Sequence, residues 1–335
     1  MADASRPLRF GVLGTGRITR KVGPAIARTP GAELAAVASR DAARAAAWKD
    51  EFGAKRAYGS YAELLDDSEL DAVYIALPPS LHREWTVKAA ERGLHVLCEK
   101  PLAPTVDEAA TMVAACRQHA VQLMDGVMWV HTPRAATIRA ILDAGALGEL
   151  RRVTSAFTFR ADGWAGDEFR RHAELGGGSL LDLGWYCVGV SLWVFGGTPQ
   201  TVWGRGLWRR DSGDASFTGQ LHFSPGETAS FDCGFETAMR KWVEIAGDAG
   251  SLVCDDFTRP WSPEMPRFWL HDEVGQSSEH RSEPFVQEDC LVAAFCEAVR
   301  SGPIHRWADR ALDVQRVCDA LLRSAREERV VETAG

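Results

Sequence analysis

The chain has 335 residues, of which 46% are hydrophobic and 25% charged, a balance typical of a folded globular protein that excludes the disordered and fibrous classes. The formal net charge of -8 at pH 7 provides no basic surface for nucleic acid or an anionic membrane, so neither is expected as a partner. At about 100 to 200 residues per domain, this length predicts two domains.

The N-terminal residues have neither the charged start nor the apolar core of a signal peptide, which favours a cytoplasmic location. The most apolar window, residues 183–197, is shorter than the roughly 20 residues of a membrane-spanning helix and predicts a buried helix. The 8 cysteines form no C-x-x-C pair, so we expect reduced thiols in the core and no metal site.

Short β-branched runs alternate with helical periodicity through the first third of the chain. This alternation is typical of βαβ units, so residues 1–125 are predicted to form a doubly wound parallel sheet. After about Gly126 the runs alternate apolar and polar residues, which predicts a mostly antiparallel sheet within a second α/β domain, residues 126–335. Strands are expected at 8–14, 33–39, 70–77, 95–100 and 121–126, then at 151–159, 201–208, 217–223, 228–235, 242–247 and 267–272.

The first strand leads into a loop with the sequence GTGRIT, beginning at Gly14. This order resembles the dinucleotide-binding pattern G-x-G-x-x-G/A, in which glycines allow a tight turn and backbone amides approach a pyrophosphate. Thr19 departs from the pattern, and any tight strand-to-helix turn can carry two glycines. A second βα unit follows, which favours nucleotide binding. The predicted contacts are Gly14, Gly16, Arg17 and Ile18.

The second predicted strand ends at Ser39 and Arg40, where an NAD-binding chain commonly places a carboxylate on the ribose. A hydroxyl and a guanidinium suit a 2′-phosphate instead, so the sequence predicts NADP in preference to NAD. In the alternative interpretation, Arg40 is a solvated charge and Asp41 caps the next helix.

The strand predicted at residues 95–100 ends in Glu99 and Lys100, and Pro101 follows. Ligands of open α/β sheets bind beyond the carboxyl ends of the strands, so Lys100 is a candidate site residue, although a surface lysine fits this position equally well. A cis bond at Lys100-Pro101 is also possible on sequence grounds.

Three consecutive glycines, 176–178, precede Ser179 and a helix that carries Asp182 and Tyr186. The i, i+4 spacing places the carboxylate and the phenol on one helical face, so both can address one substrate. Two alternatives remain open: Asp182 completes a capping box with Ser179, and Tyr186 is an aromatic residue of the core.

These motifs, together with ALPPSLH from residue 76 and CEKP from residue 98, resemble the Gfo/Idh/MocA family of nicotinamide-dependent oxidoreductases. The resemblance covers essentially the whole chain. Within the family it is nearest to the branch that contains glucose-fructose oxidoreductase, dimeric dihydrodiol dehydrogenase and NADP-dependent xylose dehydrogenase. Many members carry histidine where Tyr186 stands, although this branch also uses tyrosine.

The resemblance implies a Rossmann domain, then a domain whose large, open-faced sheet mediates assembly into a homodimer or homotetramer. It implies that Lys100 stabilises charge on the substrate oxygen, that Tyr186 transfers the proton, and that Asp182 orients the substrate or Lys100. Further cofactor contacts are predicted at Leu77, Pro78, His82, Glu99 and Lys100. Further substrate contacts are predicted at Trp129, Arg134, Trp164 and Arg170.

The leading hypothesis is an NADP-dependent oxidoreductase that transfers a hydride between the nicotinamide and a sugar or related polyol or diol carbonyl compound. One alternative is a glycosidase, epimerase or dehydratase on the same fold that regenerates its bound cofactor. Another is a non-catalytic dinucleotide sensor, which would not require Lys100, Asp182 and Tyr186 together.

Overall fold

The computed structural model describes residues 6–162, 168–209 and 213–333, which form two compact units. Unit 1 contains the chain up to Met128 together with Val286–Leu312, and unit 2 contains Trp129–Phe285 together with the chain from Asp313 onward. The sequence-based division at residues 125 and 126 places residues 286–312 with the second domain, whereas in the structure this segment packs with unit 1.

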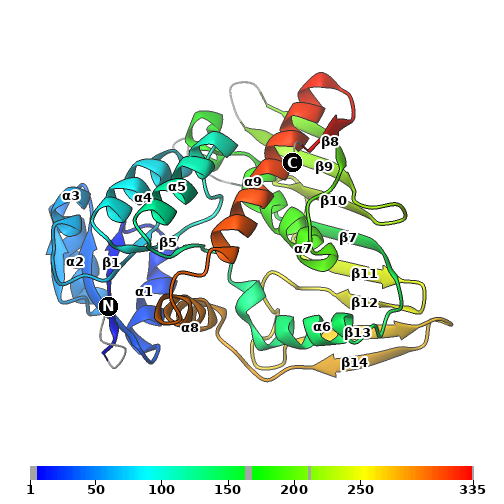
Figure 1. The fold of residues 1–335 in the computed structure, drawn as a ribbon, viewed down its shortest axis with the longest axis horizontal. Helices are drawn as coiled ribbons and strands as arrows, with labels where there is room; N and C mark the ends of the chain where they lie inside the picture. Colours follow the sequence, from blue (N-terminus) through cyan, green and yellow to red (C-terminus); the bar gives the residue numbers. More distant parts are fainter. Residues whose placement is uncertain (1–5, 163–167, 210–212, 334–335) are drawn as a thin grey trace. The chain divides into compact units, whose positions relative to one another are not determined.

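Unit 1 contains a six-stranded parallel sheet in the order β3-β2-β1-β4-β5-β6, which confirms the predicted doubly wound fold (Figure 1). The strand order reverses between β1 and β4, the position at which such sheets bind nucleotides. The strands are β1 (Leu8–Leu13), β2 (Ala32–Ala38), β3 (Arg56–Tyr58), β4 (Ala72–Ile75), β5 (His95–Cys98) and β6 (Leu123–Asp125). The helices are α1 (Thr19–Arg28), α2 (Ala42–Phe52), α3 (Tyr61–Leu65), α4 (His82–Glu91), α5 (Val106–Gln118) and α8 (Gln287–Arg300).

The core of unit 1 includes α8, although this helix is distant in sequence from the sheet. Helix α8 packs against α1, and the Phe10 and Phe295 rings lie 5.6 Å apart between their centroids. Arg28 of α1 donates to Asp289 of α8 at 2.8 Å. The strands are buried on both faces, as continuous apolar runs such as that of β4 require.

Unit 2 contains a nine-stranded sheet in the order β14-β13-β12-β11-β7-β10-β9-β8-β15. Every described pairing is antiparallel except that of β7 with β10, which confirms the predicted mostly antiparallel sheet. The strands are β7 (Leu150–Thr158), β8 (Thr201–Trp208), β9 (Asp214–His222), β10 (Thr228–Gly234), β11 (Val243–Gly247), β12 (Gly250–Cys254), β13 (Arg267–Asp272), β14 (Ser277–Arg281) and β15 (Val331–Glu332).

Helices cover one face of this sheet: α6 (Pro133–Asp143), α7 (Trp185–Phe195) and α9 (Arg306–Glu327) (Figure 1). Strand β9 shows why the sheet is two-sided, since buried Phe217 and Leu221 alternate with exposed Thr218 and Gln220. The buried face is the one toward α9, because Gly219 lies close to the Leu321 side chain. On β9 the opposite face carries the polar side chains of Thr218, Gln220 and His222.

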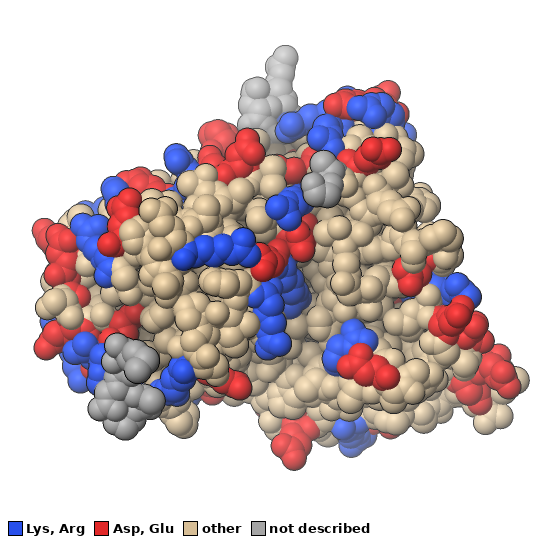
Figure 2. Space-filling view, in the orientation of Figure 1, with Lys and Arg blue, Asp and Glu red and all other residues tan. Residues whose placement is uncertain are grey.

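Among the described residues, one helical run, Ala173–Phe195, is long and apolar enough to cross a membrane by composition alone. Within the protein, 83% of its most apolar window is buried, which agrees with the predicted core helix. Figure 2 shows acidic and basic side chains interspersed on the face that it draws. All 8 cysteines are free thiols, and burial raises the pKa of Cys187 to about 12.

Candidate functional site

The glycine loop of unit 1 has the close backbone approach that the sequence predicts. Gly14 has φ +102, and a Cβ atom there would lie 2.7 Å from the carbonyl oxygen of Ala76 on the neighbouring strand end. In the described part of the chain, no side chain caps the N-terminus of α1, and its first turn holds no acidic residue. This helix terminus therefore suits an anionic group such as a pyrophosphate.

The structure explains why position 19 carries threonine where the dinucleotide-binding pattern has glycine or alanine. Its buried hydroxyl donates to the carbonyl of Gly16 at 2.7 Å and accepts from the indole of Trp48 at 3.0 Å. Close helix packing occurs instead at Gly23, where a Cβ atom would lie 2.6 Å from the Trp48 ring. Thr19 thus joins the loop to α2, a function that a third glycine cannot provide.

The end of β2 presents positive charge. Asp41 is used as a cap, because its carboxylate accepts from the backbone N–H of Ala43 at 2.9 Å and of Arg44 at 3.2 Å. Burial raises the pKa of Tyr61, while the charges of Arg40 and Arg44 beside it act in the opposite direction. Sequence analysis missed Arg44, which brings a second guanidinium to the position where a 2′-phosphate is predicted.

His82 is fully buried and connects two loops at the strand ends of unit 1. Its Nε2 lies 2.8 Å from the carbonyl of Leu77, and its Nδ1 lies 3.1 Å from the carbonyl of Pro101 and 3.2 Å from that of Leu102. Burial lowers the pKa of the imidazole. Both ring nitrogens are engaged within the protein, so His82 holds the loops beside Lys100, and its predicted cofactor contact stays a prediction.

Glu99 is buried beneath Lys100 instead of facing a ligand. Its Oε1 accepts from the Tyr74 hydroxyl at 2.6 Å, and its Oε2 accepts from the backbone N–H of Lys100 at 3.3 Å. Burial raises the pKa of this carboxyl, and these contacts oppose the rise. Glu99 therefore supports Lys100, which is half-buried and precedes a cis peptide bond to Pro101, and its predicted cofactor contact stays a prediction.

In unit 2, Asp182 lies on a single π-helical turn, η5 (Leu180–Gly184), that leads into α7, and such turns are frequent at functional sites. Asp182 is 5% exposed, and its Oδ2 accepts from Arg170 Nε at 2.7 Å. Arg170 also donates to Glu168 at 2.8 Å. Arg170, predicted to contact substrate, is thus the ion-pair partner of the predicted catalytic carboxylate.

The helix cap belongs to another residue, Asp214 of β9. Its Oδ2 accepts from the Ser179 hydroxyl at 2.5 Å and from the backbone N–H of Leu180 at 2.8 Å. The alternative in which Asp182 forms a capping box with Ser179 is therefore wrong, because Asp214 caps this helix. Gly178 permits this approach, because a Cβ atom there would lie 2.3 Å from the Asp214 carboxylate.

Tyr186 is half-buried on the first turn of α7. Its ring meets the Phe157 ring of β7 edge to face, with the centroids 5.3 Å apart. This contact fixes the orientation of the ring, and a fixed ring holds the phenol hydroxyl in one position for a substrate.

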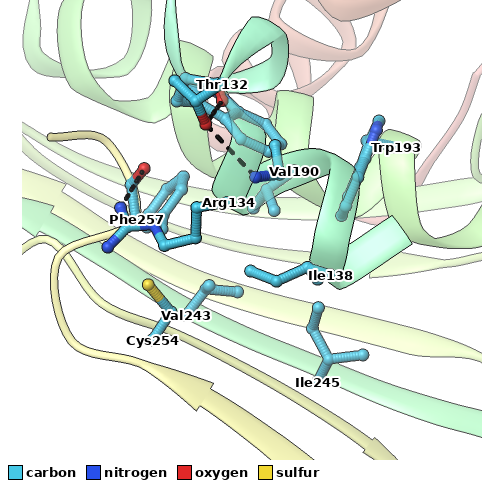
Figure 3. Close-up of a pocket in the computed structure, with 11 residues that line it drawn as sticks. Thr132, Arg134, Ile138, Val190, Trp193, Val243, Ile245, Cys254 and Phe257 are labelled. Carbon is cyan, nitrogen blue, oxygen red and sulfur yellow. Dashed lines mark hydrogen bonds between the residues drawn. The ribbon is translucent and has the colours of Figure 1, made fainter. Parts of the chain in front are cut away.

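Arg134 lies in the packed layer between α6, α7 and the sheet of unit 2 (Figure 3), and Trp129 lines the same small cavity. Arg134 is 3% exposed, forms an ion pair with Asp256 and donates to the Asp256 carbonyl at 2.9 Å. Trp129 is 5% exposed and packs against Trp193 and Phe257. These residues border a small apolar cavity of about 20 Å³. These contacts give both residues a structural role, their predicted substrate contacts stay predictions, and Trp164 lies outside the described residues.

We expect Arg134→Met to lower the free energy of unfolding by about 3 to 5 kcal/mol, because Asp256 would remain buried without its guanidinium. Urea denaturation measures this change. Arg316→Met on α9 is the control, since its i, i+3 pair with Asp313 is exposed and contributes about 1 kcal/mol or less. Unchanged stability together with a raised KM for sugar would restore the substrate-contact interpretation of Arg134.

Within residues 6–162, 168–209 and 213–333, no three His, Cys, Asp or Glu side chains lie close enough together to hold a metal ion. Three residues of the site were missed from the sequence: Arg44, Glu168 and Asp214. Arg44 carried a signal, since it follows Arg40 on the first turn of the next helix. Asp214 carried none, because its partner Ser179 lies 35 residues away.

Comparisons with known proteins agree with the fold of the two units. The profile described as "Oxidoreductase family, NAD-binding Rossmann fold" (GFO_IDH_MocA) matches residues 8–127, and the "GFO/IDH/MocA C-terminal domain" profile matches residues 135–253. D-xylose 1-dehydrogenase (NADP(+)) 2 of Haloferax volcanii is 38% identical over 97% of this chain and 99% of that protein.

Two solved structures are similar over nearly the whole chain. A 3-ketoreductase from Actinomadura kijaniata in complex with NADP and TDP-benzene has a TM-score of 0.87 at 29% identity, covering 95% of this chain and 98% of that one. An aldose-aldose oxidoreductase from Caulobacter crescentus complexed with glycerol has a TM-score of 0.89 at 27% identity, covering 98% and 100%.

Proposed function

The chain belongs to the Gfo/Idh/MocA family of oxidoreductases, and we propose that it transfers a hydride between NADP and a sugar or a related polyol or diol carbonyl compound. The observation that carries this proposal is that Lys100, Asp182 and Tyr186 are all present, each with its own supporting contact. Glu99 supports Lys100, Arg170 pairs with Asp182, and Phe157 anchors Tyr186. A dinucleotide sensor has no need of such a set.

The residues of unit 1 fit NADP. The loop at Gly14 and the uncapped start of α1 suit the pyrophosphate, while Arg17, Ile18, Leu77 and Pro78 border the same strand ends. Ser39, Arg40 and Arg44 suit the 2′-phosphate, because the nearby carboxylate of Asp41 is already used by α2. The names of similar proteins, which include an NADP(+) dehydrogenase and a complex with NADP, support the same choice.

When bound, the nicotinamide exchanges a hydride with the substrate carbon. Tyr186 transfers a proton to or from the substrate oxygen through its hydroxyl. Lys100 stabilises negative charge on that oxygen. Asp182 accepts hydrogen bonds that orient the substrate, and its ion pair with Arg170 holds the carboxylate in place.

Nicotinamide absorbance against time tests this function, with NADP or NAD and a panel of aldoses, cyclic polyols and trans-diols. Stoichiometric NADPH formation is the expected result. A product formed without net cofactor reduction would indicate the recycling glycosidase, epimerase or dehydratase class. Cofactor binding without turnover in either direction would support the sensor. We also propose a cytoplasmic homodimer or homotetramer assembled through the polar face of the unit 2 sheet, which mass measurement in solution tests.

We expect Arg40→Ala to raise the Kd of NADP by about 10- to 100-fold and to leave the Kd of NAD nearly unchanged, because a charge-assisted hydrogen bond contributes about 1.5 to 3 kcal/mol. Calorimetric titration with each cofactor measures both constants. Arg20→Ala is the control, since Arg20 pairs with Glu51 in the same unit. Equal affinities of the wild type for NADP and NAD would contradict the cofactor assignment.

A further inference from the structure

Asp182 and Tyr186 lie on two different kinds of helix. Asp182 lies within the π-helical turn η5, whereas Tyr186 lies on the first turn of α7. Four residues exceed one α-helical turn of about 3.6 residues by about 40°, so a continuous α-helix would turn the two side chains apart by that angle. The hydrogen bonds of a π turn span one more residue than those of an α-helix, which reduces this offset. The π turn therefore brings the carboxylate and the phenol closer to one line along the helix.

A π turn is a rare geometry, and contacts from outside the helix hold this one at its start. Asp214 of β9 accepts from the Ser179 hydroxyl at 2.5 Å and from the backbone N–H of Leu180 at 2.8 Å. All three residues are buried, and Asp214 is only 4% exposed. A buried carboxylate with two such donors has a fixed position, so it determines where the turn begins.

The last residue of the turn, Gly184, packs closely against β10. A Cβ atom at this position would lie 3.1 Å from the Cys233 sulfur. The Cys233 thiol also donates to the Ser179 hydroxyl at 3.8 Å. The start and the end of η5 are thus both held against the sheet, at β9 and at β10.

The ion-pair partner of Asp182 is held by the same end of β9. The backbone N–H of Gly213, which precedes Asp214, donates to the carbonyl of Arg171 at 3.2 Å. The neighbouring residue, Arg170, donates to Asp182 at 2.7 Å. The strand end therefore holds the turn through a side chain and holds the arginine segment through its backbone. Loss of the Asp214 carboxylate would release the turn and leave the backbone contact to the arginine segment in place.

We propose that Asp214 is a positioning residue that keeps η5 in its π-helical form and thereby sets the direction of Asp182 relative to Tyr186. This inference rests on the proposed function. Without the carboxylate, the turn is expected to relax to α-helical geometry, which turns Asp182 away from the line of Tyr186 and away from Arg170.

Asp214→Ala is expected to lower kcat by about 10²-fold, the cost typical of misplacing a reacting group by about 1 Å, and to leave the Kd of NADP unchanged. Asp214→Asn is expected to recover most of the kcat, because its amide oxygen can still accept from Leu180. The full-length protein is assayed with NADP and the compound of the panel above that has the highest kcat/KM. Thermal unfolding of each sample reports its stability.

Ser179→Ala is a milder variant that removes one of the two hydrogen bonds to Asp214. Its kcat is expected to fall by about 3- to 10-fold, since the N–H of Leu180 keeps its acceptor. Ser191→Ala is the matched control, because Ser191 is 1% exposed and its hydroxyl donates to the carbonyl of Cys187 at 2.9 Å within α7. The control should lose stability and keep the wild-type kcat.

A double-mutant cycle separates positioning from a general loss of stability. In an Asp182→Asn background, Asp214→Ala is expected to lower kcat by less than about threefold more, because its effect passes through the carboxylate that is already lost. A wild-type kcat in Asp214→Ala, or losses that multiply in full in the cycle, overturns the inference and leaves the proposed function intact. If Asp214→Ala does not fold, Ser179→Ala takes its place in both comparisons. A wild type that turns over no compound of the panel overturns both the inference and the proposed function.

Discussion

Replacing Lys100 with methionine is expected to lower kcat by about 10³-fold. The substitution removes the positively charged ammonium and keeps a side chain of similar length. The backbone of Lys100 is held by Glu99, and the adjacent loop is held by His82, so the ammonium is presented from a fixed strand end. Stabilisation of a developing oxyanion by such a group acts mainly in the transition state, so KM should change much less than kcat.

Steady-state nicotinamide absorbance measures this loss, with the Kd of NADP determined separately by titration. Lys88→Met provides a matched control in the same unit, since Lys88 forms an exposed i, i+4 pair with Glu84 on α4 and lies 4.5 Å from the centroid of the Trp85 ring. Its kcat should equal that of the wild type. Retention of half or more of the wild-type kcat in Lys100→Met would assign this lysine to the protein surface.

The fold was largely predictable because the burial of one or both faces of an element sets the spacing of apolar residues along the sequence. Strand β4 is buried on both faces and appears as a continuous apolar run, while β9 has one polar face and alternates. Strand β14 was not predicted, because Ser277–Arg281 is polar throughout and lies at the sheet edge. The periodicity of α8 predicted a helix, but not that Phe295 completes the core around Phe10.

The candidate site was predictable only where a motif fixes the backbone. The tight turn at Gly14 occurs as predicted, and the bond at Lys100-Pro101 is cis, which the sequence allowed. Side-chain direction was not predictable, since it depends on partners far along the chain. Arg134 points inward and pairs with Asp256, which lies 122 residues away in the sequence. Asp214 caps the helix that begins near Ser179, a role for which the sequence offered Asp182. A motif therefore indicates which residues share a strand end, whereas long-range pairing decides which of them remain available to a ligand.

Tyr186→Phe is expected to lower kcat by about 10²- to 10⁴-fold, the range typical of losing a general acid or base. The substitution keeps the ring and its edge-to-face contact with Phe157, so the melting temperature should remain close to that of the wild type. The pH–rate profile should also lose the limb that reports the phenol, because the variant has no group to titrate there. Steady-state kinetics across pH, with thermal unfolding of the same samples, measures both effects.

Tyr58→Phe is the matched control, since it removes a hydroxyl that donates to Asp67 at 2.9 Å in the other unit. It should cost some stability through the lost hydrogen bond and leave kcat and the pH profile unchanged. If Tyr186→Phe instead turns over at the wild-type rate, Tyr186 is an aromatic packing residue of α7 and another group must carry the proton. If both its rate and its melting temperature fall, the hydroxyl is also part of the packing, and the pH–rate profile then decides whether it titrates during turnover.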